Sequence, residues 1–221
     1  MSKIITGKSG GVSGGRSAGA RGKGSDVMMN EGARRMARWV VFAGLIVFTA
    51  VLLGVLLTFC GRDGTFHLDY SISRYMGREA WGAIIFGIGN LVLVGCIGKY
   101  VWEMREFYGK MWVVIMAIMT GCFIGLSFCP IGLFDEVYGN FGIVSTLHQI
   151  FARLMFIMMA VAAVVMGVKR KKQKWYLGIC IAYALYAVGC AILSATTQMF
   201  WDFNFVFETA YIYLFYVILM L

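Results

Sequence analysis

The chain has 221 residues, of which 60% are hydrophobic and only 14% are charged, and its mean hydropathy is +0.77. So much apolar surface exceeds what one soluble core can bury, and the surplus has to face lipid. The net charge of +9 does not indicate a nucleic-acid partner, because the basic residues lie in clusters between apolar runs, where they orient a membrane protein. We therefore expect a membrane protein with no nucleic-acid partner.

Neither a metal site nor a cofactor is expected. None of the six cysteines falls in a CxxC or other metal-ligand spacing, and the only histidines are His67 and His148. A zinc site needs at least three such ligands from the protein, so the sequence does not supply one.

Residues 1–36 are predicted to form a disordered cytoplasmic tail. Up to residue 32 this segment is rich in Gly, Ser, Lys and Arg and holds almost no large apolar side chain. Such a tail either attracts anionic lipid headgroups or is solvated and only helps to fix the topology. We favour the second interpretation.

Residues 37–221 are predicted to form an all-α transmembrane domain of about six helices. Long apolar runs with a single proline favour helices over the alternating strands of a barrel. The first run is too long for a signal peptide and lacks a cleavage site, so it stays in the mature protein. The runs cover residues 39–59, 81–101, 111–129, 143–168, 175–195 and 205–221.

The orientation follows from the basic residues of alternate loops. Lys and Arg gather in the tail, around residues 99–110 and at residues 169–174, whereas most acidic residues lie in the other loops. The positive-inside bias places the N-terminus in the cytoplasm and the acidic loops outside. We expect a multi-pass protein of the cell membrane, or of an endomembrane in a eukaryote.

The predicted helix over residues 143–168 has one polar sector. At 100° per residue, Thr146, Gln149 and Arg153 share a stripe, and His148 lies on the next one. Arg153 approaches the bilayer midplane, where a charge costs about 2.5 to 3.5 kcal/mol, so it should face protein or water. Asn90 lies at a similar depth and Glu208 opens the last helix, which makes both of them candidate partners for Arg153 in a ligand site or in a structural contact.

His148 is also a candidate general base. Asp135 or Glu136 can orient its imidazole, and these groups lie near the predicted outer surface. A satisfied polar contact is the more ordinary interpretation, since the chain has no GxSxG or HExxH motif. Cys60 and Cys129 both lie at the outer ends of their predicted helices, so they can form a disulfide if the outer compartment is oxidising.

Glycines are frequent in the second and third predicted helices. Gly121 and Gly125 form a GxxxG motif, which lets two helix backbones approach closely. We expect packing within the bundle, with a homodimer face as the alternative.

Three segments, FHLDYSISRYMGREAWGAIIFGIGNLVLVG, GLSFCPIGLFDE and STLHQIFARLMFIMM, occur in this order on the predicted helices. Together they resemble the six-span membrane proteins called the domain of unknown function 998 family, over about residues 40–221. Helix 6 departs from that pattern, because Thr209 follows Glu208 where an arginine is expected. The resemblance implies a fold related to a DRAM-like group linked with lipid remodelling, lysosomal function and phosphoinositide regulation, and no established reaction. The matching positions are Tyr70, Ser71, Ser73, Gly77, Pro130, Gly132, Asp135 and His148.

Three functions remain open, and we rank them in this order. The first is binding of a membrane lipid or protein partner in an outward-facing polar pocket, without catalysis. The second is an intramembrane enzyme acting on a lipid, with His148 as base, Asp135 orienting it, and Ser71 or Ser73 as nucleophile. The third is a small transporter in which Arg153 and Glu208 line an anion or proton path.

Overall fold

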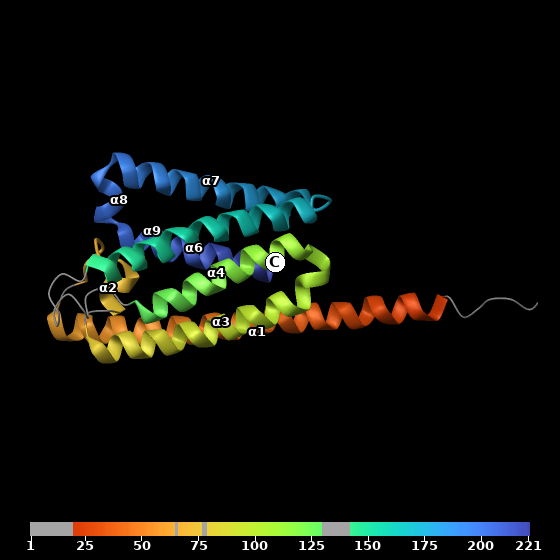
Figure 1. Cartoon of the computed structure of the whole chain (residues 1–221), viewed down its shortest axis with the longest axis horizontal. Helices are drawn as coiled ribbons and strands as arrows, with labels where there is room; N and C mark the ends of the chain where they lie inside the picture. The colour runs from red at the N-terminus through yellow and green to blue at the C-terminus, as the bar shows by residue number, and fades with distance from the viewer. Residues whose placement is uncertain (1–19, 65, 77–78, 130–141) are drawn as a thin grey trace, which may run out of the picture.

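Figure 1 shows the computed structural model of the chain, which describes residues 20–64, 66–76, 79–129 and 142–221. Within these ranges all the regular structure is helical, which confirms the predicted all-α class. Two short helices lie between the long ones: α2 (Ile72–Met76) and α8 (Gln198–Asp202). The longer helices are α1 (Ala20–Asp63), α3 (Ala80–Tyr108), α4 (Lys110–Phe128), α6 (Gly142–Lys169), α7 (Lys174–Thr196) and α9 (Asn204–Met220).

Five of these helices are long and apolar enough to cross a membrane: residues 31–60 of α1, and α3, α4, α6 and α7. The chain is therefore a multi-pass membrane protein by helix length and hydropathy. The predicted sixth run is also helical, but α9 has only 17 residues. At 1.5 Å per residue this gives about 25 Å, which is less than the ~30 Å hydrocarbon core. Six spans and a cytoplasmic N-terminus stay predictions.

Helices that follow one another in the chain lie side by side. α1 packs on α3, α3 on α4, α4 on α6, and α6 on α7, while α9 packs against α1, α6 and α7 (Figure 1). The side chains that face away from the bundle are mostly apolar, as in Leu57, Ile84, Ile88, Leu185 and Val188. This surface suits lipid contact.

The two ends of the bundle differ in charge and in the short elements that they carry. We call one the basic end; it carries residues 31–38 of α1, the α3–α4 turn at Gly109, and the α6–α7 turn at residues 170–173. Gly109 makes this one-residue turn at φ +88°, a backbone conformation that favours glycine. We call the other the pocket end; it carries α2, α8 and the ends of the long helices beside them (Figure 1).

Helix α1 begins at Ala20, so residues 20–36 of the segment expected to be a disordered tail are helical. The run ARRMAR at residues 33–38 is made of strong helix formers, which favours extension of the helix beyond the apolar run. Residues 1–19 lie outside the described residues. Helix α3 likewise continues to Tyr108, past the predicted end at residue 101.

Candidate functional site

A pocket lies in the pocket-end half of the bundle, with α2 across it. Its non-atom space, counted together with the open solvent at its mouth, is about 670 Å³. Its walls come from α1, α2, α3, α4, α6 and α9, so it forms only when these helices are packed together. The lining residues are Phe48, Ile72, Ser73, Met76, Ala83, Phe86, Asn90, Phe123, Leu126, Ser127, His148, Ala152, Met155, Phe156, Glu208 and Ile212.

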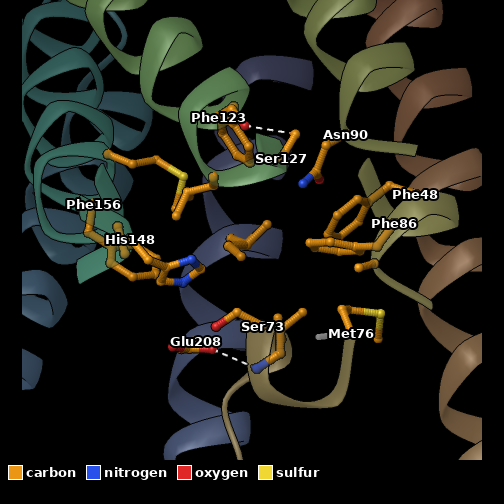
Figure 2. Close-up of a pocket in the computed structure, with 16 residues that line it drawn as sticks. Phe48, Ser73, Met76, Phe86, Asn90, Phe123, Ser127, His148, Phe156 and Glu208 are labelled. Carbon is orange, nitrogen blue, oxygen red and sulfur yellow. Dashed lines mark hydrogen bonds between the residues drawn. The ribbon is translucent and has the colours of Figure 1, made fainter. Parts of the chain in front are cut away.

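The lining is mostly apolar, with its polar groups at two levels. Figure 2 shows Asn90 and Ser127 at one level and Ser73 and Glu208 at the other, with His148 on a side wall. Phenylalanine rings and aliphatic side chains separate the two levels. No lysine or arginine lines the pocket among the described residues. The pocket therefore suits an amphiphilic molecule whose polar part is neutral or cationic.

Helix α2 is held over the pocket by hydrogen bonds at its first turn. The Ile72 N–H donates to Glu208 Oε2 at 2.9 Å, and the Arg74 N–H donates to Ser71 Oγ at 3.1 Å. Backbone N–H groups at a helix start have no partner within the helix, so Ser71 and Glu208 cap α2. The Ser71 and Ser73 hydroxyls also lie 3.0 Å apart. Two candidate residues, Ser71 and Glu208, thus have clear structural roles.

His148 is buried, with 5% of its surface exposed. Its Nδ1 lies 2.6 Å from the carbonyl oxygen of Cys129, and because a carbonyl only accepts, Nδ1 carries the proton of this bond. In neutral imidazole Nε2 then holds a lone pair that can accept from a ligand or act as a base. The ring points toward the centre of the pocket in Figure 2.

Asn90 is the most deeply placed polar residue of the pocket. Only 2% of its surface is exposed, and its Oδ1 has no hydrogen-bond partner in the described part of the chain. A buried amide oxygen without a partner costs about 1 to 3 kcal/mol, so native proteins seldom keep one unless a water or ligand pairs with it. Asn90 therefore marks a position where a bound polar group would improve the hydrogen bonding.

The structure does not place Arg153 or Gln149 in the pocket. Both are exposed on α6, so the structure does not bring Arg153 together with Asn90 and Glu208, and a ligand-binding role for Arg153 and Gln149 stays a prediction. Five residues at 100° put Arg153 about 140° around the helix from His148, beyond the buried face. No hydrogen bond or ion pair within the described residues holds its guanidinium. Asn90, Glu208, His148 and Ser73 do come together, as the lining residues show.

Several sequence predictions lie outside the described residues. Asp135, Pro130 and Gly132 belong to residues 130–141, and Gly77 is also outside, so the Asp135–His148 pair stays a prediction. Cys60 and Cys129 are both described, and both are free thiols.

Sequence reasoning missed Ser127 and most of the apolar lining. Ser127 is a hydroxyl within a run of apolar residues near the end of α4, which could have drawn attention to it. Its Oγ donates to the Phe123 carbonyl at 2.9 Å, a common satisfied state for serine in a helix, and leaves lone pairs free to accept. The aromatic walls give no comparable sequence pattern, because aromatic residues occur in every span.

Comparison of the chain with protein-family models, curated proteins and solved structures finds no match. The resemblance to the six-span family therefore stays a prediction, and the pocket has to be interpreted from its own residues.

Proposed function

We propose that this multi-pass membrane protein binds a membrane lipid, or a lipid-like amphiphile, in the pocket under α2, and that it does so without catalysis. The observation that supports this most is the unpartnered Asn90 amide oxygen in an otherwise apolar pocket. The apolar walls suit an acyl chain, and the polar groups at two levels suit a headgroup with hydroxyl or ammonium donors.

Because no cation is present in the described lining, the pocket should prefer lipids whose headgroup is not anionic. Glu208 contributes a carboxylate, and His148 offers a lone pair on Nε2 when it is neutral. An anionic phosphate would meet no positive partner here and would be repelled by an ionised Glu208. We expect neutral or zwitterionic lipids, or those with a free hydroxyl, to occupy the pocket in preference to anionic ones.

The test is an Asn90→Leu variant, which keeps the volume and removes the unpartnered amide. Removing a buried unsatisfied polar group should leave the free energy of unfolding unchanged or raise it by about 1 to 2 kcal/mol. If the amide binds lipid, retention should nevertheless fall about tenfold, because one hydrogen bond is lost. Native mass spectrometry of gently extracted protein identifies and quantifies the retained lipid.

The matched control is Arg153→Leu, which changes a polar residue of the same membrane region outside the pocket. Its lipid retention should equal that of the parent, since Arg153 does not line the pocket. If Asn90→Leu retains the same lipid in the same amount as the parent, the pocket is not the binding site. If the parent retains no lipid, a protein partner or a second copy of the chain becomes the better candidate for what this protein binds.

A lipid-modifying enzyme is the second candidate, and the bond from His148 Nδ1 to the Cys129 carbonyl favours it. That bond orients the imidazole with Nε2 free, as a general base requires, and Ser73 lines the same pocket. No hydrogen bond joins His148 to Ser73 within the described residues. Turnover of a lipid panel by purified protein should vanish in a His148→Ala variant, and turnover that persists would exclude this assignment.

A further inference from the structure

Two arginines near the start of the apolar span of α1 have spare hydrogen-bond donors at the basic end. Arg34 and Arg38 are one helical turn apart and so share a face of α1. Both are half-buried, and the Nε of each is buried with no partner in the described part of the chain. The Arg34 guanidinium lies over the Phe107 ring at 4.4 Å, and Arg38 interacts electrostatically with Tyr100. Packing against Phe107 thus positions the Arg34 guanidinium, and Arg38 lies close enough to Tyr100 of α3 to act on it electrostatically.

No carboxylate neutralises these two arginines among the described residues. Glu103, on the nearby part of α3, binds Lys99, and Glu106 lies 3.7 Å from Arg105. A half-buried cation with neither a counter-ion nor a full set of acceptors is costly. Two such cations on one face indicate that an anion with several oxygen atoms is the missing partner.

Two aromatic side chains at the basic end also have unpartnered polar atoms. Tyr108 and Trp112 are fully buried, and neither the Tyr108 hydroxyl nor the Trp112 Nε1 has a partner among the described residues. The Tyr108 ring contacts both Phe107 and Trp112, at centroid distances of 4.8 and 4.6 Å. The Trp112 indole N–H is therefore a further donor at this end without an acceptor among the described residues.

The depth of the arginines fits the headgroup layer of a membrane. Trp39, Trp102 and Trp175 are exposed at the basic end, with 61%, 62% and 54% of their surfaces accessible. Exposed tryptophans of this kind collect at membrane–water interfaces. Arg38 directly precedes Trp39 in α1, and Arg34 lies one turn farther from the apolar span. Both side chains would sit where lipid phosphates are found.

We propose that Arg34 and Arg38 form a binding site for the phosphate of an anionic phospholipid headgroup at the basic end. Guanidinium groups are suited to this role, because their planar fork donates two parallel hydrogen bonds to a phosphate. This site is separate from the pocket under α2, which has no cation in its described lining. It does not depend on the function proposed for that pocket.

The experiment compares two double variants of equal charge in nanodiscs that contain phosphatidylcholine and phosphatidylglycerol in equal amounts. Arg34→Gln with Arg38→Gln removes the proposed ligands. Arg35→Gln with Arg105→Gln is the matched control: Arg35 is exposed between the two ligands, and the Arg105 donors already bind the Trp102 carbonyl and Glu106. Lipids retained after release are identified by native mass spectrometry, and folding is checked by thermal unfolding.

We expect the parent and the control to retain phosphatidylglycerol in preference to phosphatidylcholine, and the Arg34/Arg38 variant to lose this preference by about tenfold or more. Equal losses in both double variants would show a diffuse surface-charge effect and overturn the proposal. A parent without any preference for phosphatidylglycerol, and without stabilisation by phosphate, would also overturn it.

Two further arms complete the test. Inorganic phosphate is added to protein in detergent: stabilisation of the parent and the control but not of the Arg34/Arg38 variant would support the phosphate site with free phosphate as its source. If the glutamine variant fails to fold, Arg34→Lys with Arg38→Lys keeps the charge but loses the fork and the Nε–H. Its anionic-lipid preference should fall below that of the parent, and an undiminished preference would contradict the guanidinium site.

Discussion

The pocket end and the basic end of the bundle each hold polar groups in apolar surroundings, but the kinds of polar group and their surroundings differ. The pocket end keeps a hollow, and its lining offers a carboxylate, an imidazole, an amide and hydroxyls but no cation among the described residues. The basic end is closely packed, and its unpartnered buried atoms are Arg34 Nε, Arg38 Nε, Tyr108 Oη and Trp112 Nε1. By the two proposals above, the ends would select different headgroups: neutral or cationic at one, anionic at the other.

The largest effect should come from testing the close packing of the basic end with Gly167→Val. A Cβ at Gly167 would lie 2.8 Å from the Cβ of Cys180 on α7, too close for two carbon atoms, so α6 and α7 would have to separate. We expect a loss of about 3 kcal/mol in the free energy of unfolding. Reversible denaturation in mixed detergent micelles measures it.

A milder change near the pocket is Gly87→Ala. A Cβ there would meet the Ser127 carbonyl oxygen at 3.4 Å, which is ordinary contact. The alanine variant should differ from the parent by less than about 1 kcal/mol. If Gly167→Val were as stable as Gly87→Ala, the close approach of α7 to α6 at Gly167 would not be as described.

Glu208→Leu tests whether the cap of α2 closes the pocket end. The substitution leaves the Ile72 N–H without its acceptor, a loss of about 1 to 3 kcal/mol. Amide hydrogen exchange over residues 72–76 should speed up about tenfold or more, while exchange at the basic end stays as in the parent.

Glu208→Gln is the control for this experiment, because its amide oxygen can still accept from Ile72. Exchange in α2 should remain close to that of the parent. A leucine variant whose α2 amides exchange no faster than those of the glutamine variant would contradict the capping role of Glu208.

The positions of the long helices could be predicted from the sequence, whereas the side of each helix that faces the bundle interior could not. Apolar runs of spanning length located each long helix, and depth alone identified Asn90 and Glu208 as residues of interest. The sequence grouped Arg153 with Asn90 and Glu208, but the structure places Arg153 outside the pocket. Thr146, Gln149 and Arg153 share a stripe of the helix, and periodicity alone does not say whether that stripe faces lipid, water or another helix. The role of Glu208 as a cap was also hidden, since it depends on α2, a helix of five residues between two spans.

Tyr75→Phe tests the segment that carries α2, with a smaller expected effect. The Tyr75 hydroxyl accepts from the His67 N–H at 2.6 Å and lies 2.7 Å from the His67 carbonyl, to which it donates. Removing it should destabilise residues 66–76 by about 1 kcal/mol. Exchange over residues 66–76 should rise about fivefold, without change in α6 or α7.

The same contact gives a pH dependence. Burial raises the pKa of the Tyr75 hydroxyl above its usual value. The bond that the hydroxyl donates is therefore fully present below the unfolded pKa of about 10, and its stabilisation is lost as the pH rises through the folded pKa. Stability lost above pH 10 should be smaller in the phenylalanine variant than in the parent; equal losses would place the titrating group elsewhere.

The smallest effect is expected for Arg153→Leu, which belongs to neither end. Its side chain is exposed near the middle of α6, where no described residue pairs with it. A charge at this depth costs about 2.5 to 3.5 kcal/mol toward insertion unless it reaches the surface, so leucine should leave the fold intact and insert at least as well. Insertion assays and thermal unfolding measure both quantities. A variant that inserts but unfolds more easily than the parent would show that Arg153 has a partner, and that α6 uses both of its polar stripes within the bundle.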